Sequence, residues 1–438
     1  MKVKLPYGKG NVLLELPEER TEIIEPKKIK ESRSTNEILE KALNKPLGGE
    51  KLEEIVRGKR ICALVADTTR KQPYKEQIEA CAKKLKEANH IQYIITTGSH
   101  DPDDEGNFRI ARFIENSAKK YHLHYGILIH DCEKPMEEVG ITGRGTKVEV
   151  DKETLDADLF LVTANMKNHY FAGYSNVVKH FLPGCCSFRT IEMNHGLALE
   201  PEATFGRHPW HPDLKRKTNP VAEDMLETMQ LIAQGRPIYT LATIGAEKLI
   251  WAAAGDAETV TREGIKIVDQ TTSFKLQPQK YIIVSPGGHP YDETLYAAQR
   301  GVDLTKNAVL AQGEILWLAA CNGGYQGLGP AKKTKEFFYD PLTLDKPKNL
   351  LAVEVKKNYR LYKQKAYKMA YFMGKVSKIW LYSELDDNIV EAAHLYLAKN
   401  PQEIVNQWIK NDPQGKILVF KQANKLAIYA SNRTEKNT

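Results

Sequence analysis

Two patterns alternate along most of this chain: short apolar runs of strand length and longer amphipathic segments of helix length. The alternation begins near Arg60 and is typical of a parallel sheet whose strands are joined by crossover helices. One such helix is predicted from Tyr74 to Ala88. The strands expected in this half are Ile61–Ala66, Ile91–Thr97, Tyr125–Ile129 and Leu159–Ala164.

A second α/β region begins after about residue 270. Strands are expected at Tyr281–Ser285 and Ile379–Tyr382, with a helix over Glu293–Arg300. The segment Thr259–Leu276 forms a plausible boundary. We therefore expect an α/β fold of two domains with largely parallel sheets and an active-site cleft between the domains. Residues 1–270 are expected to form the catalytic and cofactor-binding domain. Residues 271–438 are expected to form the domain that closes the cleft.

Both ends of the chain show the alternation of a β-hairpin. Lys2–Leu5 and Asn11–Leu16 flank a glycine-rich turn, and we assign this first hairpin to the N-terminal domain. Residues 416–430 alternate in the same way around Gln422-Ala423-Asn424. The pattern leaves open whether this terminal hairpin packs on the first domain or on the second.

Composition narrows the class of protein. Of 438 residues, 42% are hydrophobic and 27% charged, which are globular values, and no apolar run is long enough to span a bilayer. The first residues lack the pattern of a secretion signal, so a cytoplasmic location is expected.

The six cysteines show no CxxC spacing, which argues against a disulfide framework and a structural zinc site. A net charge of +7 spread along the chain favours a small anionic substrate over nucleic acid.

Polar residues follow three of the predicted strands. Asp67-Thr68-Thr69-Arg70 comes after the first strand, Gly98-Ser99-His100 after the second, and Asn165 to His169 after the fourth. Ligands of open parallel sheets bind beyond the carboxyl ends of the strands, so we expect these loops to meet at one edge.

Each of these residues also has a purely structural interpretation. Asp67 and Thr68 could cap the following helix, Arg70 could pair with a surface carboxylate, and His100 and His169 could be ordinary loop histidines. Their convergence at one edge favours a catalytic site. A guanidinium that binds a carboxylate and two imidazoles are the groups that a two-base proton-transfer site needs.

The segment from Ser175 to Gly184 predicts a short helix that Ser175 caps and Pro183-Gly184 ends. The backbone amides at the start of such a helix could bind an anion, and Lys179 would lie one helical turn after them. The simpler interpretation is that Lys179 is a solvated lysine on an ordinary helix. His195 follows within Asn194-His195-Gly196. No standard nucleotide-binding fingerprint is present.

Taken together, these motifs resemble the lactate racemase family, the enzymes that use a nickel-pincer nucleotide. The separations from His169 to Lys179 and from Lys179 to His195 match the family pattern. The resemblance continues into the second half through Gly287-Gly288-His289-Pro290 and Leu295-Tyr296. It covers most of the chain and is specific as a set.

The resemblance implies a racemase or epimerase that inverts C2 of a 2-hydroxy acid by reversible hydride transfer to the cofactor. Lys179 would attach the cofactor covalently, and His195 would bind its nickel. His100 and His169 would be the paired acid/base groups, and Arg70 would hold the substrate carboxylate. The residues expected beside the cofactor are Asp67, Thr68, Thr69 and Ser175. Cofactor maturation enzymes and a homo-oligomer are the implied partners.

Two departures from the family pattern affect substrate and cofactor. Ser175-Asn176-Val177 stands where the family usually has Ser-Gly-Gly, so side chains there are expected to reshape the pocket near the cofactor. Tyr296 and Arg300 are predicted to orient the substrate, but Ala297 and Arg300 replace the usual glutamine and lysine. An amide is lost and a guanidinium gained, so we expect a substrate other than lactate, such as an aldonic acid.

Two other functions remain open at this point. The chain could be a non-catalytic cofactor binder, although such a protein needs only Lys179 and His195. It could also be a zinc-dependent hydrolase with His169 and His195 as ligands, although their spacing is atypical of a zinc site.

Overall fold

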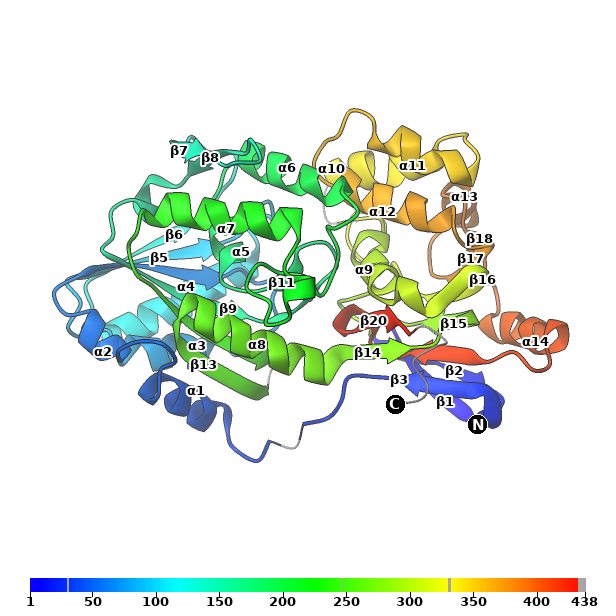
Figure 1. Ribbon diagram of the computed structural model, residues 1–438, viewed down its shortest axis with the longest axis horizontal. Coiled ribbons are helices and arrows are strands. Elements are labelled where there is room, and N and C mark those ends of the chain that lie inside the picture. Colours follow the sequence, from blue (N-terminus) through cyan, green and yellow to red (C-terminus); the bar gives the residue numbers. More distant parts are fainter. Residues whose placement is uncertain (30, 247, 330–331, 432–438) are drawn as a thin grey trace. The chain divides into compact units, whose positions relative to one another are not determined.

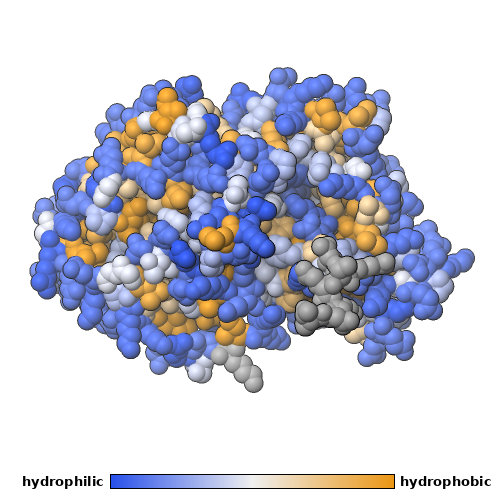
Figure 2. Space-filling view, viewed as in Figure 1, coloured by the Kyte–Doolittle hydropathy of each residue, from blue (hydrophilic) through white to orange (hydrophobic). Residues whose placement is uncertain are grey.

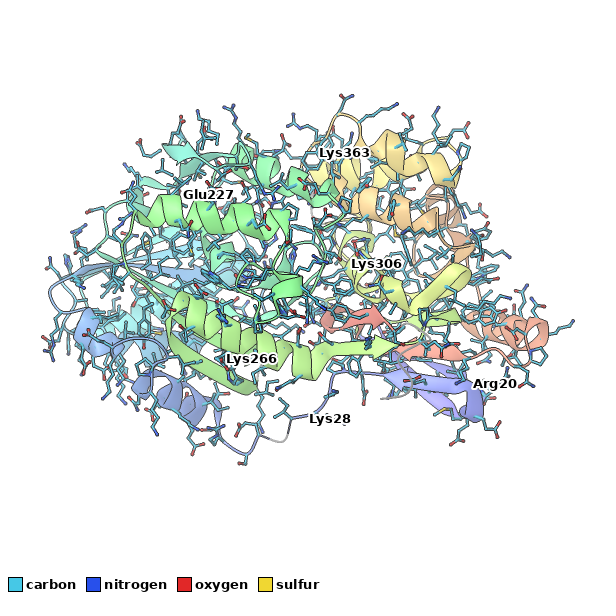
Figure 3. The ribbon with its side chains drawn as sticks, viewed as in Figure 1. Arg20, Lys28, Glu227, Lys266, Lys306 and Lys363 are labelled. Atoms are coloured by element: carbon cyan, nitrogen blue, oxygen red, sulfur yellow. The ribbon has the colours of Figure 1, made fainter. Side chains whose placement is uncertain are left out.

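The computed structural model describes residues 1–29, 31–246, 248–329 and 332–431, and the chain divides into two compact units. One unit is Lys28–Gln270, and the other joins Met1–Lys27 to the chain from Thr271 onward (Figure 1). Figure 3 labels Lys28 on the segment that leads from one unit into the other. The N-terminal 27 residues, which we expected in the first domain, therefore belong to the second unit.

The Lys28–Gln270 unit is built on a six-stranded sheet with the order β13-β12-β9-β4-β5-β6. All neighbouring pairs are parallel except the β12–β13 hairpin at one edge, which the sequence analysis missed. The four predicted strands are confirmed to within one residue. Their bounds are β4 Arg60–Ala66, β5 His90–Thr96, β6 Tyr125–Ile129, β9 Leu159–Asn165, β12 Ile238–Gly245 and β13 Leu249–Asp256.

Helices cover both faces of this sheet, as a parallel sheet requires. Ile61, Ala63 and Val65 of β4 face a core shared with α1, α3 and α4. On the opposite face, Phe160 of β9 packs its ring 5.2 Å from that of Phe181 in α5. The helices of the unit are α1 Thr35–Asn44, α2 Leu52–Ile55, α3 Tyr74–Ala82, α4 Glu105–Lys120, α5 Val178–Phe181, α6 Phe188–Gly196, α7 Pro220–Ala233 and α8 Ala257–Thr272.

Helix α3 ends six residues earlier than predicted. The backbone of Glu87 accepts from Gly58 and that of Asn89 donates to Lys59, which draws the chain out of the helix and aligns β5 with β4. Two small antiparallel pairs complete the unit. They are β7 Glu137–Ile141 with β8 Lys147–Val150, and β10 Lys167–His169 with β11 Gly173–Ser175.

The second unit contains a six-stranded sheet with the order β18-β17-β16-β15-β19-β3, and its paired neighbours are all parallel. Here the expected terminal hairpin is wrong. β19 pairs with β15 and β3 within this sheet, whereas β20 pairs in parallel with β14. The strands are β1 Lys2–Tyr7, β2 Gly10–Glu15, β3 Thr21–Ile24, β14 Ser273–Leu276, β15 Gln279–Val284, β16 Val309–Leu318, β17 Lys378–Tyr382, β18 Tyr396–Leu397, β19 Ile417–Phe420 and β20 Ala427–Ala430.

Both faces of the second sheet are covered as well. Trp317 belongs to a core that includes α9, α11 and α12, while Leu316 points into a core formed by the β1–β2 hairpin and α14. Leu5 and Leu14 of the hairpin are fully buried there. The helices are α9 Leu295–Thr305, α10 Lys332–Thr334, α11 Lys348–Lys356, α12 Lys363–Met373, α13 Asp387–Ala392 and α14 Pro401–Asn411.

The surface in Figure 2 is mostly hydrophilic, with scattered apolar residues. Among the helices that the structure describes, none has both the length and the apolar character needed to cross a membrane.

Candidate functional site

The first unit has a topological switch point beside β4. From β4, the chain adds β5 and β6 on one side and β9 and β12 on the other. The loops that follow β4, β5 and β9 therefore leave the same edge, as predicted, and open sheets bind ligands at such a point.

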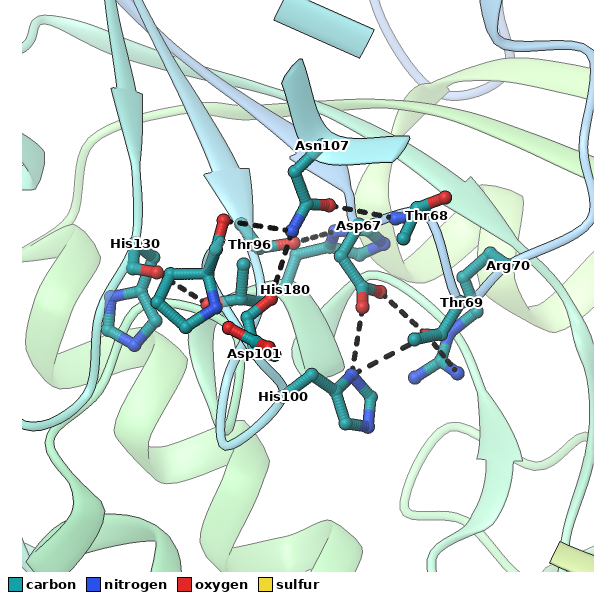
Figure 4. A network of polar contacts seen from close by, with 12 residues as sticks. Asp67, Thr68, Thr69, Arg70, Thr96, His100, Asp101, Asn107, His130 and His180 are labelled. Carbon is teal, nitrogen blue, oxygen red and sulfur yellow. Dashed lines mark hydrogen bonds and ion pairs between the residues drawn. The ribbon is translucent and has the colours of Figure 1, made fainter. Parts of the chain in front are cut away.

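His100 and Asp67 form the central polar contact of this edge (Figure 4). The Nδ1 atom of His100 lies 2.8 Å from Oδ2 of Asp67. Burial alone would raise the pKa of Asp67, but the charge and hydrogen bond of His100, with Arg70 nearby, hold it at about 2. When His100 is neutral, the ionised carboxylate still accepts its Nδ1–H, and Nε2 keeps a lone pair for a ligand.

The Asp67–Arg70 loop is held by its own side chains. Thr69 Oγ1 donates to Oδ1 of Asp67 at 2.9 Å, and Arg70 Nη1 donates to Thr69 Oγ1 at 3.1 Å. The hydroxyl of Tyr74 donates to the carbonyls of Asp67 and Arg70. Asp67 and Thr69, which we expected beside the cofactor, thus belong to a hydrogen-bonded loop that contacts His100 through Asp67.

Thr68 lies against the start of α4. Its backbone N–H donates to Oδ1 of Asn107 at 3.1 Å, and the Asn107 amide donates to the carbonyl of Asp101 at 3.1 Å. A Cβ atom on Gly106 would lie 1.9 Å from Thr68 Oγ1, so only glycine at this position lets the Thr68 side chain lie so close to the start of α4. Asn107 therefore links the loop after β4 to the loop after β5.

Phe171 brings together three of the predicted site residues. Its ring centroid lies 4.6 Å from that of His169 and 5.1 Å from that of His195, and Lys179 Nζ lies 5.8 Å from the ring. The side chain is 2% exposed. Sequence reasoning gave Phe171 no role, because an aromatic residue in an apolar stretch looks like ordinary core.

His195 is a buried, neutral imidazole. Burial, with the charge of Lys179, lowers its pKa to about 3. Asn194 donates through Nδ2 to Val221 O and Asp224 Oδ2, so its Oδ1 faces the Nδ1 of His195 at 3.1 Å. Nδ1 therefore carries the proton, and Nε2 keeps the lone pair that a metal needs.

His169 lies at the end of β10 and has a different environment. Its Nδ1 accepts from the backbone N–H of Ala172 at 3.1 Å. The neutral ring therefore carries its proton on Nε2, the reverse of the arrangement at His100. The two histidines are thus not equivalent.

The short helix α5 holds Lys179 but is capped differently from the prediction. Ser175 lies in β11, where it pairs with Lys167. Asn176 supplies the cap, since its Oδ1 accepts from Val178 N at 3.1 Å. Asn176 and Val177 are 1% and 0% exposed. Both side chains pack in the interior, and their expected effect on the cofactor pocket stays a prediction.

A further imidazole at this edge was missed. Thr96 donates its hydroxyl proton to Val65 O at 3.0 Å, so its oxygen accepts from Nδ1 of His180 at 3.1 Å. Burial, with Arg70 nearby, lowers the pKa of His180 to about 3, and the ring stays neutral. His180 had no motif to mark it, because it follows Lys179 in an otherwise apolar segment.

Tyr296 and Arg300 lie one turn apart on α9 of the second unit. Thr294 caps this helix by accepting from Ala297 N at 3.1 Å. The Tyr296 ring packs 5.3 Å from that of Phe338, and Lys365 Nζ lies 4.1 Å from its centroid. The structure therefore places the two predicted substrate residues on one helix face.

The donor set suits a metal that is carried mainly by an organic group. The described residues include no cluster of three or more His, Cys, Asp or Glu side chains that could hold a metal ion. His195 instead offers a single neutral nitrogen and Lys179 offers an amine, and both lie beside the Phe171 ring. These residues fit a cofactor attached through an amine, with one protein ligand to its metal.

Comparison with known proteins agrees with these observations. Residues 7–206 match the model of the lactate racemase N-terminal domain. The lactate racemase of Thermoanaerobacterium thermosaccharolyticum is 28% identical over 76% of this chain and 78% of its own length, and that of Lactiplantibacillus plantarum is 25% identical over 80% of each.

Two solved structures share the fold. The lactate racemase apoprotein from Thermoanaerobacterium thermosaccharolyticum has a TM-score of 0.82 at 24% identity, covering 98% of this chain and 100% of that chain. A Thermotoga maritima protein has a TM-score of 0.65 at 14% identity, covering 91% and 98%. The two-unit α/β architecture is therefore shared along nearly the whole chain.

Proposed function

Since the chain belongs to the lactate racemase family, we propose that it is a racemase or epimerase that inverts C2 of a 2-hydroxy acid. The observation that carries this proposal is the contact between His100 and the ionised Asp67 at the switch point, because it fixes a proton-accepting nitrogen there. A carrier protein has no use for such a pair.

The proposed roles follow from the chemistry of each side chain. His100 takes the hydroxyl proton of the substrate through Nε2, and Asp67 stabilises the imidazolium that forms. His169 is the partner acid/base group for the opposite enantiomer. The guanidinium of Arg70 binds the substrate carboxylate.

The residues around Phe171 fit a nickel-pincer nucleotide, with Lys179 as the point of covalent attachment and His195 as the nickel ligand. The chemistry that this group supplies when bound is reversible hydride acceptance from C2. Thr68 and Ser175 remain candidates for contacts to it. Cofactor maturation enzymes, a homo-oligomer and a cytoplasmic location are further parts of the proposal.

We also propose a substrate other than lactate, with Tyr296 and Arg300 helping to orient it. Ala297 cannot replace an amide, and Arg300 presents a planar fork where a lysine presents a single ammonium. A larger or more polar 2-hydroxy acid suits these changes. The zinc-hydrolase alternative lacks support, because the described residues do not supply three ligands.

Cofactor loading tests the assignment of Lys179 and His195. The protein is purified after co-expression with cofactor maturation enzymes, and nickel content and intact mass are measured. Lys179→Ala should lose the covalent mass increment, and His195→Ala should lose nickel. Lys71→Ala, which changes an exposed lysine next to Arg70 in the sequence, should keep both. Full loading of Lys179→Ala would show that the attachment is assigned wrongly.

A further inference from the structure

His180, near the end of α5, is a histidine that the proposed chemistry does not use. Its Nδ1 donates to Thr96 Oγ1 at 3.1 Å (Figure 4), because the hydroxyl of Thr96 donates its own proton to the carbonyl of Val65 at 3.0 Å. A neutral imidazole that carries its proton on Nδ1 has a lone pair on Nε2. The Nε2 atom of His180 is therefore a hydrogen-bond acceptor.

Burial and two positive neighbours keep this ring neutral. Desolvation is the main cause of its low pKa, which is about 3, and Arg70 and Lys179 lower the pKa further against the opposing charge of Asp67. The imidazolium form is therefore negligible between about pH 5 and about pH 9. Near neutral pH the ring does not act as an acid or a base, and Nε2 only accepts.

The surroundings of Nε2 distinguish His180 from a structural histidine. At His130, which is fully buried, both ring nitrogens have protein partners, Asp151 Oδ2 at 2.6 Å and Cys186 O at 3.1 Å. At His180 no described residue donates to Nε2, and this atom does not belong to the buried polar atoms that lack a partner. The side chain is 8% exposed, so Nε2 lies in the part of the ring that solvent and ligands reach.

Thr96 places the ring at the switch point of the first sheet. Thr96 is the last residue of β5, and its partner in β4 is Ala66, which precedes Asp67. The charges of Asp67 and Arg70 both act on His180. The acceptor therefore lies close to the groups that are proposed to bind and deprotonate the substrate.

We propose that Nε2 of His180 accepts a hydrogen bond from a substrate hydroxyl on C3, so that the site selects 2,3-dihydroxy acids. This inference rests on the proposed function and names its substrate class. Arg70 binds the carboxylate and His100 faces the C2 hydroxyl, which leaves C3 as the carbon whose substituent meets His180. A methyl group there leaves the lone pair without a donor, and a second carboxylate places negative charge against it.

Three acids that differ only in the group on C2 test this preference. Lactate has a methyl group, glycerate a hydroxymethyl group and tartronate a second carboxylate. His180→Leu removes both ring nitrogens, whereas His180→Gln keeps an amide that can donate to Thr96 and present an oxygen. Phe181→Leu is the matched control, because it changes the packing of α5 on Phe160 and leaves the imidazole in place.

The first measurement is kcat/KM for inversion by cofactor-loaded protein. Wild type should favour glycerate over lactate by about tenfold, as expected for one hydrogen bond to a neutral acceptor. His180→Leu should lose this preference and His180→Gln should recover part of it. Phe181→Leu should affect both acids equally. Tartronate should inhibit His180→Leu more strongly than wild type.

The second measurement does not depend on turnover. Nitrogen-15 spectra of histidine-labelled protein, assigned with His180→Gln, should show the Nδ1–H tautomer of His180 between about pH 5 and about pH 8. Glycerate should shift the Nε2 signal further than lactate does. The titrations are made on cofactor-free and on cofactor-loaded protein.

Three outcomes would overturn the proposal: a proton on Nε2, an equal response of wild type to glycerate and lactate, or a preference for glycerate that survives in His180→Leu. Failure of the proposed function gives a different result. In that case loaded protein inverts no acid, while the Nε2 signal still reports whether glycerate donates a hydrogen bond to His180.

Discussion

Asp67 determines which nitrogen of His100 is available for proton transfer. Asp67→Asn replaces an acceptor by a group that can donate to Nδ1, which moves the imidazole proton to Nε2. We expect kcat to fall by roughly 10³–10⁴, as for other misoriented catalytic histidines. Nickel content should be unchanged, and Thr69→Val, which removes only one bond to Asp67, should lose far less activity. If Asp67→Asn were as active as wild type, the claim that Asp67 orients His100 as the catalytic base would be excluded.

The same carboxylate makes stability depend on pH. The pKa of Asp67 in the folded protein is about 2, below its unfolded value, so the ionised form stabilises the fold at neutral pH. The contribution, about 2 kcal/mol, should disappear as pH falls from about 4 to about 2. Urea unfolding of wild type and Asp67→Asn should therefore converge over this acid range. A constant difference between them would contradict the assigned shift.

His130 is a structural rather than a catalytic residue. It is fully buried, and its ring nitrogens face Asp151 Oδ2 at 2.6 Å and Cys186 O at 3.1 Å. His130→Ala leaves the Asp151 carboxylate buried without its partner, so the free energy of unfolding should drop by about 3–5 kcal/mol. His124→Ala, at an exposed position, should cost under about 0.5 kcal/mol. A similar small loss at His130 would show that the pair is dispensable.

Residues at strand ends were predictable, whereas those that support them were not. His100 and Arg70 follow predicted parallel strands, and strand ends of a parallel sheet meet at one edge. Phe171, His180 and Asn176 lie in apolar or loop segments whose contacts form only in the folded chain. Ser175 was predicted as the cap because serine is a common capping residue, but the β10–β11 pairing holds it in a strand.

At the scale of elements, close packing explains why glycine occupies position 173. Gly173 has φ +72°, and an added Cβ would meet a backbone carbonyl that cannot move aside. Gly145, with φ +83°, has open space around its Cβ position and is a matched control. Gly145→Ala should cost about 1 kcal/mol through its backbone conformation alone, and Gly173→Ala about 2 kcal/mol more. Chemical denaturation measures both, and equal losses would contradict the contact.

Strands with a helical connection were predicted well, since a buried parallel strand is a continuous apolar run. The terminal segment was not, because two short alternating strands look the same whether they pair with each other or with distant partners. Residues 417–420 and 427–430 found partners more than 100 positions away in β15 and β14. Local alternation contains no information about such long-range pairing.

At the scale of the whole molecule, the N-terminal 27 residues complete the second unit. β3 is an edge strand of its sheet, and Leu5 and Leu14 are fully buried in its core. We expect Lys28–Gln270 to fold alone, and a fragment from Thr271 onward to fold only when Met1–Lys27 is fused to it. Circular dichroism and cooperative unfolding would check both fragments. A stable, cooperative fragment without the first 27 residues would contradict this account.

The central claim is inversion at C2 with hydride transfer, and one assay tests it most directly. Protein purified with its maturation enzymes is incubated with enantiopure 2-hydroxy acids deuterated at C2, covering aliphatic, aromatic, dicarboxylic and sugar acids. We predict inversion of at least one acid with deuterium retained at C2, and slower turnover of lactate than of that acid. No inversion of any acid by protein that contains nickel and the covalent adduct would contradict the claim and favour a non-catalytic cofactor binder.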